Sequence, residues 1–171
     1  MPTLSVNYIS KTYKSPASAC GAGREIPVLS KIVFEVKPRE FVSIIGRNAS
    51  GKSTLLKIIA GVVKATSGTF TVDGNAAYMP QDHTLLPWRT VEDNLLLPGD
   101  IQNISRGAAR ARIQSLLAEF GLDQYVGSYP SLLSGGTRQK IALLRTVIQK
   151  ASILLLDEPF AMIDALTRLE S

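Results

Sequence analysis

The sequence has little of several residue types, and each scarcity argues against a class of protein. A single cysteine, Cys20, excludes an internal disulfide and favours a reducing compartment. The longest apolar runs, such as residues 153–156, are far shorter than the roughly 20 residues of a membrane-spanning helix. The chain has no positively charged start followed by an apolar stretch, as a signal peptide would. We therefore expect a cytoplasmic protein. Its 171 residues are enough for one domain with a sizeable core.

Positive charge is in excess but is not concentrated. The formal net charge is +5, and the densest cluster is Arg106, Arg110 and Arg112 on one expected helix. No interleaved aromatic residues or binding motif accompany this cluster, so we expect no nucleic-acid partner. A solvated helix face, or attraction to an anionic membrane surface, explains the cluster better.

Residues 46–53 read Gly-Arg-Asn-Ala-Ser-Gly-Lys-Ser and fit the pattern G-x-x-x-x-G-K-S/T. The apolar run 41–45 before them predicts a buried strand, and residues 55–59 after them predict a helix that ends at Gly61. Strand, glycine-bounded loop and helix form the context that a phosphate-binding loop requires. The alternative is a glycine turn that carries Lys-Ser by chance.

Such a loop turns its backbone N–H groups inward, and the helix N-terminus adds a partial positive charge. Lys52 can then reach the β- and γ-phosphates of a nucleotide, and the Ser53 hydroxyl can bind Mg²⁺. The candidate nucleotide-binding residues are Gly46, Arg47, Asn48, Ala49, Ser50, Gly51, Lys52, Ser53 and Thr54.

Two carboxylates follow a second apolar run. Residues 153–156 predict a strand that lies beside the phosphate-loop strand, which would bring Asp157 near the Mg²⁺ site. Glu158 could then orient or deprotonate the attacking water. The alternative is that the two acidic residues only cap a following helix.

A third motif reads Ser134-Gly135-Gly136 at the start of an expected helix. Free N–H groups, the positive helix end and the lack of side chains make this a second possible anion site. By itself the motif is also compatible with a plain N-cap and a flexible turn. Two phosphate-binding helix starts in one chain suggest a composite site, in which this helix closes over nucleotide held by a partner's phosphate loop.

The rest of the chain predicts an α/β domain with a helical insert. Residues 108–120 form the clearest amphipathic helix, and a second helix is expected from Ser134 to about Lys150. Further strands are expected at 3–13, 28–36, 69–72 and 75–79. Within one domain, 1–171, we divide the chain into a β subdomain with the phosphate-loop core (1–81), a helical insert (82–133) and a C-terminal part (134–171).

Together these motifs resemble the nucleotide-binding domain of ATP-binding cassette (ABC) transporters, from about Leu4 to Asp164. The resemblance implies a P-loop NTPase fold of the ABC type, with an N-terminal antiparallel β subdomain and an inserted helical subdomain. It implies that Tyr13 stacks on adenine, that Gln81 touches Mg²⁺ and senses the membrane subunit, and that Asp164 belongs to a loop at the dimer interface. It makes Glu158 and Gln81 the catalytic residues, with Ser53, Gln81 and Asp157 on Mg²⁺.

The segment 85–94 and the sequence Glu158-Pro159-Phe160 are similar to bacterial importers of the nitrate, sulfonate and taurine group. This similarity implies an ATP-hydrolysing subunit of an importer for a small anionic solute. It implies a homodimer on the cytoplasmic face of the inner membrane, bound to a permease and indirectly to a solute-binding protein. Trp88 would face the permease, or alternatively lie buried in the helical subdomain.

Some residues depart from the family pattern. Ala49 stands where relatives usually have Gly, Thr137 replaces the signature Gln, and Met162 is large for its position. The sequence ends at Ser171, whereas relatives continue through another core strand with a switch histidine, a role that His83 cannot take.

We therefore expect this chain to lack a core strand, to bind ATP weakly, to hydrolyse it slowly and to aggregate. The alternatives are a non-hydrolysing remnant of such a subunit, or a soluble ABC ATPase that acts on nucleic acid or ribosomes.

Overall fold

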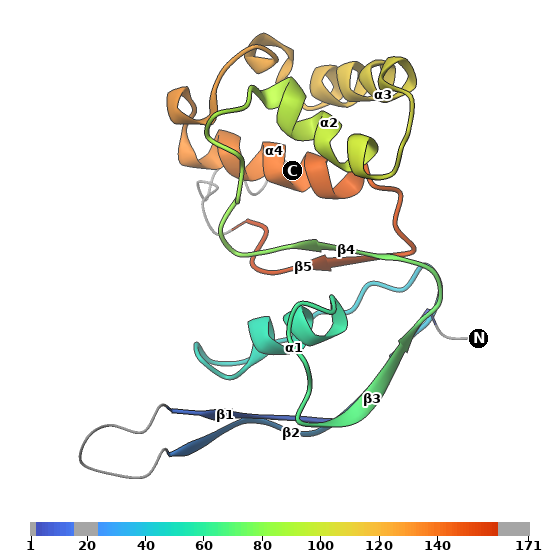
Figure 1. Cartoon of the computed structure of the whole chain (residues 1–171), viewed down its shortest axis with the longest axis vertical. Helices are drawn as coiled ribbons and strands as arrows, with labels where there is room; N and C mark the ends of the chain where they lie inside the picture. Colours follow the sequence, from blue (N-terminus) through green and yellow to red (C-terminus); the bar gives the residue numbers. More distant parts are fainter. Residues whose placement is uncertain (1–2, 16–23, 161–171) are drawn as a thin grey trace.

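The structure is a computed structural model, and it describes residues 3–15 and 24–160. Its elements form three levels: a sheet with one helix, a central pair of strands, and a group of helices (Figure 1). In chain order they are β1 (Leu4–Lys14), β2 (Glu25–Val36), α1 (Lys52–Ile59), β3 (Ser67–Val72), β4 (Ala76–Met79), α2 (Val91–Ile101), α3 (Arg106–Glu119), η1 (Asp123–Tyr125), η2 (Pro130–Leu132), α4 (Gly135–Val147) and β5 (Ile153–Leu156).

The first level is an antiparallel sheet in the order β2-β1-β3. The central strand β1 buries Leu4, Val6 and Ile9 on one face, against the helix α1. A break in the strand register between Val6 and Ile9 accompanies a positive φ of 54° at Tyr8 and keeps both apolar side chains inside. The predicted antiparallel β subdomain is confirmed.

The parallel strands β4 and β5 lie between two cores, with α1 on one side and α4 on the other (Figure 1). Leu155 of β5 packs with α1 and the first sheet, and Met79 of β4 packs with the helices. Of residues 153–156 only Leu155 is buried, and Leu154 is 41% exposed at the cavity that residues 41–44 also line, so this apolar run is not buried along its whole length.

The helices α2, α3 and α4 enclose the second core. Ile113 and Leu117 of α3 are buried as the helical periodicity predicts, and the helix ends before Gly121, which has a φ of 63°. The helix α2 was not among the predicted elements, because Pro98 lies inside it. Its start does have a recognisable feature, since the Thr90 side chain accepts a hydrogen bond from the Asp93 amide.

The predicted strand at residues 41–45 is wrong. The segment is not a strand, and the side chains of Phe41 and Ile45 are 88% and 93% exposed. The expectation that β5 lies beside this segment is also wrong, because β5 pairs with β4. A cavity of about 500 Å³ has residues 41–44 on one wall and β5 on another.

A strand forms only where a neighbour completes its backbone hydrogen bonds. In the part of the chain that the structure describes, no strand pairs with residues 41–45. The exposed apolar side chains there, and the unpaired edge of β5, are the features expected to promote aggregation.

Within residues 3–15 and 24–160, no helix has the length and apolar character needed to cross a bilayer. Three residues discussed from the sequence, Cys20, Met162 and Asp164, lie outside the described ranges.

Candidate nucleotide-binding site

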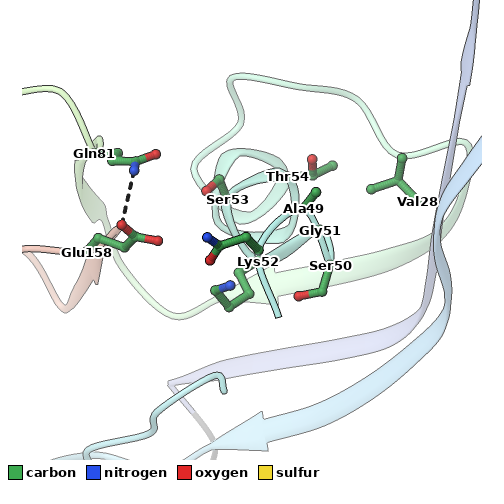
Figure 2. Close-up of a pocket in the computed structure, with 10 residues that line it drawn as sticks. Val28, Ala49, Ser50, Gly51, Lys52, Ser53, Thr54, Gln81 and Glu158 are labelled. Atoms are coloured by element: carbon green, nitrogen blue, oxygen red, sulfur yellow. Dashed lines mark hydrogen bonds between the residues drawn. The ribbon is translucent and has the colours of Figure 1, made fainter. Parts of the chain in front are cut away.

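The loop between β2 and α1 forms one side of a cavity of about 500 Å³ (Figure 2). Residues 48–54 supply the loop side, Val28 of β2 contributes an apolar side chain, and Gln81 and Glu158 line it from across the cavity. Seven of the nine predicted loop residues, 48–54, therefore line one cavity with two residues far away in the sequence, whereas Gly46 and Arg47 do not line it.

Gly51 allows this loop to pack against the β subdomain. Its φ is 93°, and a Cβ built there would lie 2.8 Å from Leu29 Cδ2 and 3.0 Å from the Val28 carbonyl oxygen. Only glycine satisfies both the backbone conformation and the close approach. The helix α1 begins immediately afterwards at Lys52, so its free N–H groups lie at the cavity.

Lys52 is held by the loop itself. Its Nζ donates to the carbonyl oxygens of Gly46 and Arg47, each at 3.0 Å. These two bonds place a positive charge within the loop, next to the start of α1, where an anionic ligand is favoured.

A buried carboxylate lies beside the first turn of α1. Asp157 is 3% exposed and accepts hydrogen bonds from Ser53 Oγ at 2.9 Å and Tyr78 Oη at 3.3 Å. Ser53 and Asp157 therefore lie close together, as the sequence predicts, although β5 does not pair with residues 41–45.

Tyr78 is a site residue that the sequence analysis did not find. Burial, followed by the charge of Asp157 and the hydrogen bond to it, raises the pKa of Tyr78 to about 12. The phenol therefore stays protonated and donates to Asp157 at neutral pH. Its place opposite Leu155 in the β4–β5 pair follows from the strand register, which no local sequence feature reveals.

Gln81 and Glu158 each follow the C-terminal end of a strand, β4 and β5, and their side chains contact each other. Gln81 Nε2 donates to Glu158 Oε2 at 3.0 Å (Figure 2). Glu158 has a φ of 51°, an unusual conformation for a residue with a side chain. Such strain is more common at functional sites than elsewhere.

Other predicted site residues lie apart from this cavity. Ser134 caps α4 by accepting a hydrogen bond from the Thr137 amide at 3.1 Å, so the predicted N-cap is confirmed. Gly135 and Gly136 follow it in the first turn of α4. Within the described residues, neither this turn nor Tyr13 lines the cavity; the Tyr13 ring lies under Lys11 Nζ, 4.8 Å from its centroid.

Ala49 adopts a φ of 61°, in the left-handed region of backbone conformation. Its Cβ is therefore expected to strain the loop. We predict that Ala49→Gly raises the free energy of unfolding by about 0.5–1 kcal/mol, since relief of 1–2 kcal/mol of strain exceeds the extra entropy of an unfolded glycine. Denaturant unfolding measures the change, with Ala60→Gly at the right-handed C-cap of α1 as the control. Destabilisation by Ala49→Gly equal to that of the control would contradict the prediction.

Comparison with known proteins agrees with this geometry. The family model described as ABC transporter matches residues 29–161.

The chain belongs to the ABC transporter family.

A taurine import ATP-binding protein of Rhizobium johnstonii is 39% identical over 154 residues, which cover 85% of this chain and 59% of that protein. An aliphatic sulfonates import ATP-binding protein of Corynebacterium glutamicum is 43% identical over 142 residues, covering 83% and 58%. The chain thus spans about three fifths of the length of these ABC relatives.

The fold agrees with that of solved ABC cassettes. The ATP-binding cassette MJ0796, in a dimeric post-hydrolysis state bound to ADP and Pi, is 28% identical with a TM-score of 0.85. The alignment covers 96% of this chain and 77% of the cassette. A second dimeric structure of MJ0796 gives a TM-score of 0.86. The P-loop ABC fold predicted from the sequence is confirmed.

Proposed function

We propose that this chain is the ATP-binding and ATP-hydrolysing part of a subunit that energises an ABC importer. The observation that carries the proposal is the convergence of three separate segments on one cavity. The loop with Lys52, the Gln81 side chain and the Glu158 side chain all line it.

The residues present fit a magnesium ion bound together with nucleotide. Ser53 and Asp157 offer hard oxygen ligands in direct contact, the kind that Mg²⁺ prefers. Among the described residues, no group of three or more His, Cys, Asp or Glu side chains could form a protein-only metal site. This agrees with an ion that takes few ligands from protein and the rest from phosphate and water. Bound there, Mg²⁺ would neutralise phosphate charge.

The protein's own groups would then act mainly by position and charge. Lys52 and the loop amides would hold the β- and γ-phosphates, and the Ser53 hydroxyl would turn from Asp157 toward the ion. Glu158 would orient the attacking water or accept its proton, with Gln81 holding the carboxylate by the 3.0 Å hydrogen bond. Tyr13 would contact the base.

Two chains would complete the site. The first turn of α4, with Ser134, Gly135 and Gly136, lies away from the cavity in its own chain, so it would act on nucleotide bound to the partner. The dimeric cassettes with the same fold support a homodimer of this kind. Asp164 would lie at the same interface.

The dimer would bind a permease at the cytoplasmic face of the inner membrane, and a solute-binding protein would act through that permease. The Trp88 side chain is 70% exposed, so the alternative that it is buried in the helical subdomain is wrong, and it is available for a permease. We propose a small anionic solute of the nitrate, sulfonate and taurine type, and the names of the relatives support the taurine and sulfonate part of this group. A formylaminopyrimidine import relative from Halalkalibacterium halodurans, 40% identical over 83% of this chain and 58% of that protein, shows that similar chains serve other solutes.

The proposal is tested by measuring, with analytical sedimentation, whether the chain dimerises when ATP is added. Glu158→Gln is used to keep nucleotide bound, and Gly136→Glu places a bulky acidic side chain at the expected contact with the partner's phosphate. We expect Mg·ATP to convert the Glu158→Gln chain from monomer to dimer, and we expect the added Gly136→Glu to prevent this while each chain still binds ATP.

Phosphate release then distinguishes an enzyme from a remnant. Release by the unsubstituted chain that slows with Glu158→Gln supports hydrolysis at this site. ATP binding without dimerisation or phosphate release would contradict the proposed activity and favour a non-hydrolysing remnant.

A further inference from the structure

The helix α4 holds the backbone on both sides of the Gln81–Glu158 contact through two polar side chains. Gln139 is 1% exposed, and its Nε2 lies 3.4 Å from the Glu158 carbonyl oxygen, to which it donates. Six residues further along the helix, the Arg145 guanidinium reaches the loop that follows Gln81. The helix α4 therefore contacts both the Glu158 backbone and the loop that follows Gln81.

Arg145 makes three hydrogen bonds to two adjacent residues. Nη1 donates to the Thr84 carbonyl at 3.1 Å, while Nη2 donates to the His83 carbonyl at 3.2 Å and to Thr84 Oγ1 at 2.9 Å. Thr84 has a φ of 45°, so the loop has an unusual backbone conformation at the point where the guanidinium holds it. A planar fork with several fixed donors suits this arrangement, whereas a lysine ammonium does not.

Nothing else in the described structure accounts for a cation at this place. No carboxylate among the described residues pairs with Arg145, and burial lowers its pKa. Burying a charge is costly unless its hydrogen bonds are met, and here backbone carbonyls and one hydroxyl meet them. The interaction therefore fixes the loop's position at a cost in desolvation.

We propose that Arg145 is a positioning residue that ties the Gln81 segment to α4, so that the Ser134 end of the helix and the Gln81–Glu158 contact move together. The inference rests on the proposed function. From Ser134 to Arg145, a straight helix extends about 16 Å, a stiff link between the expected partner contact and the loop. Engagement of the Ser134 turn by a partner's nucleotide would then set the position of Gln81 against Glu158.

A double-mutant cycle tests this coupling with the full chain. Mg·ATP affinity is measured for the unsubstituted chain, Gln81→Ala, Arg145→Gln and the double variant, with Lys140→Gln as a control that removes another cation from α4. We expect Gln81→Ala to weaken binding about fivefold in the unsubstituted and Lys140→Gln chains, the loss of about one hydrogen bond. In the Arg145→Gln chain the same change should cost less than twofold, because Gln81 is no longer held in place.

A purely structural role of Arg145 predicts a different result. The effects of the two substitutions would then add, and a fivefold loss from Gln81→Ala in the Arg145→Gln chain would overturn the proposal. If Arg145→Gln does not fold, Arg145→Lys serves in its place, because it keeps the charge but loses the forked geometry.

Hydrogen exchange tests the tie without any nucleotide. The amides of Leu85 and Leu86 are hydrogen-bonded, to His83 Nδ1 and Asn94 Oδ1. We expect them to exchange at least fivefold faster in Arg145→Gln than in Lys140→Gln, with α4 equally protected in both. Unchanged exchange would overturn the tie, whereas absence of Mg·ATP binding by the unsubstituted chain would instead contradict the proposed function.

Discussion

Replacing Lys52 by methionine is expected to weaken ATP binding about 100-fold, since each hydrogen bond to a charged group contributes about 1.5–3 kcal/mol. In the structure the Lys52 ammonium donates hydrogen bonds to the carbonyl oxygens of Gly46 and Arg47, at the start of the loop. A bound triphosphate would draw it to the β- and γ-phosphates, where methionine offers no charge and no donor. Isothermal titration of each chain with Mg·ATP measures the effect.

The control for this loss is Lys57→Met, which removes a cation from the last turn of the same helix. It should leave the affinity within about twofold, because Lys57 does not line the cavity. Lys52→Met also loses the hydrogen bonds to Gly46 and Arg47, so we expect it to lower the free energy of unfolding by about 1–3 kcal/mol, which denaturant unfolding measures beside the titration. Equal ATP affinities for the two variants would contradict the role given to Lys52.

Gly51→Ala is expected to lower the free energy of unfolding by about 2–4 kcal/mol, from left-handed strain plus overpacking. The added methyl group would lie 2.8 Å from Leu29 Cδ2 and would have to form at a φ of 93°. Either β2 or the loop must shift, and a shift of the loop misplaces the amides at the start of α1. ATP affinity should therefore fall as well.

Gly107→Ala in α3 is the matched control, because a Cβ there meets nothing within 4 Å. It should leave stability unchanged or raise it by up to about 1 kcal/mol, since alanine favours a helix over glycine. Denaturant unfolding and Mg·ATP titration of both variants give the comparison. A Gly51→Ala chain as stable and as tightly binding as the Gly107→Ala chain would show that the close approach at Gly51 has no consequence.

Local sequence was sufficient where a feature depends on neighbours in the chain. The glycine spacing around Gly51 predicts the phosphate loop, Ser134 predicts the start of α4, and the apolar run 153–156 predicts the strand β5. In each case the backbone conformation follows from residues within a few positions. Propensity and periodicity capture such effects directly.

The failures concern contacts between distant segments. Residues 41–45 have a strand-like composition, but the described chain provides no partner for their backbone groups, so they stay unpaired and exposed. Tyr78 reaches Asp157 only because β4 and β5 pair in one particular register. Arg145 contacts Thr84 at a sequence separation of 61, for which no local pattern exists.

The measurement that tests the central claim most directly is an equilibrium titration of the chain with ATP, with and without Mg²⁺, beside the same titration of Lys52→Met. If the loop, Gln81, Asp157 and Glu158 form one nucleotide site, binding is saturable with one ATP per chain, is tighter with Mg²⁺, and is about 100-fold weaker in Lys52→Met. Binding that is absent, or equal in both chains, would contradict the account.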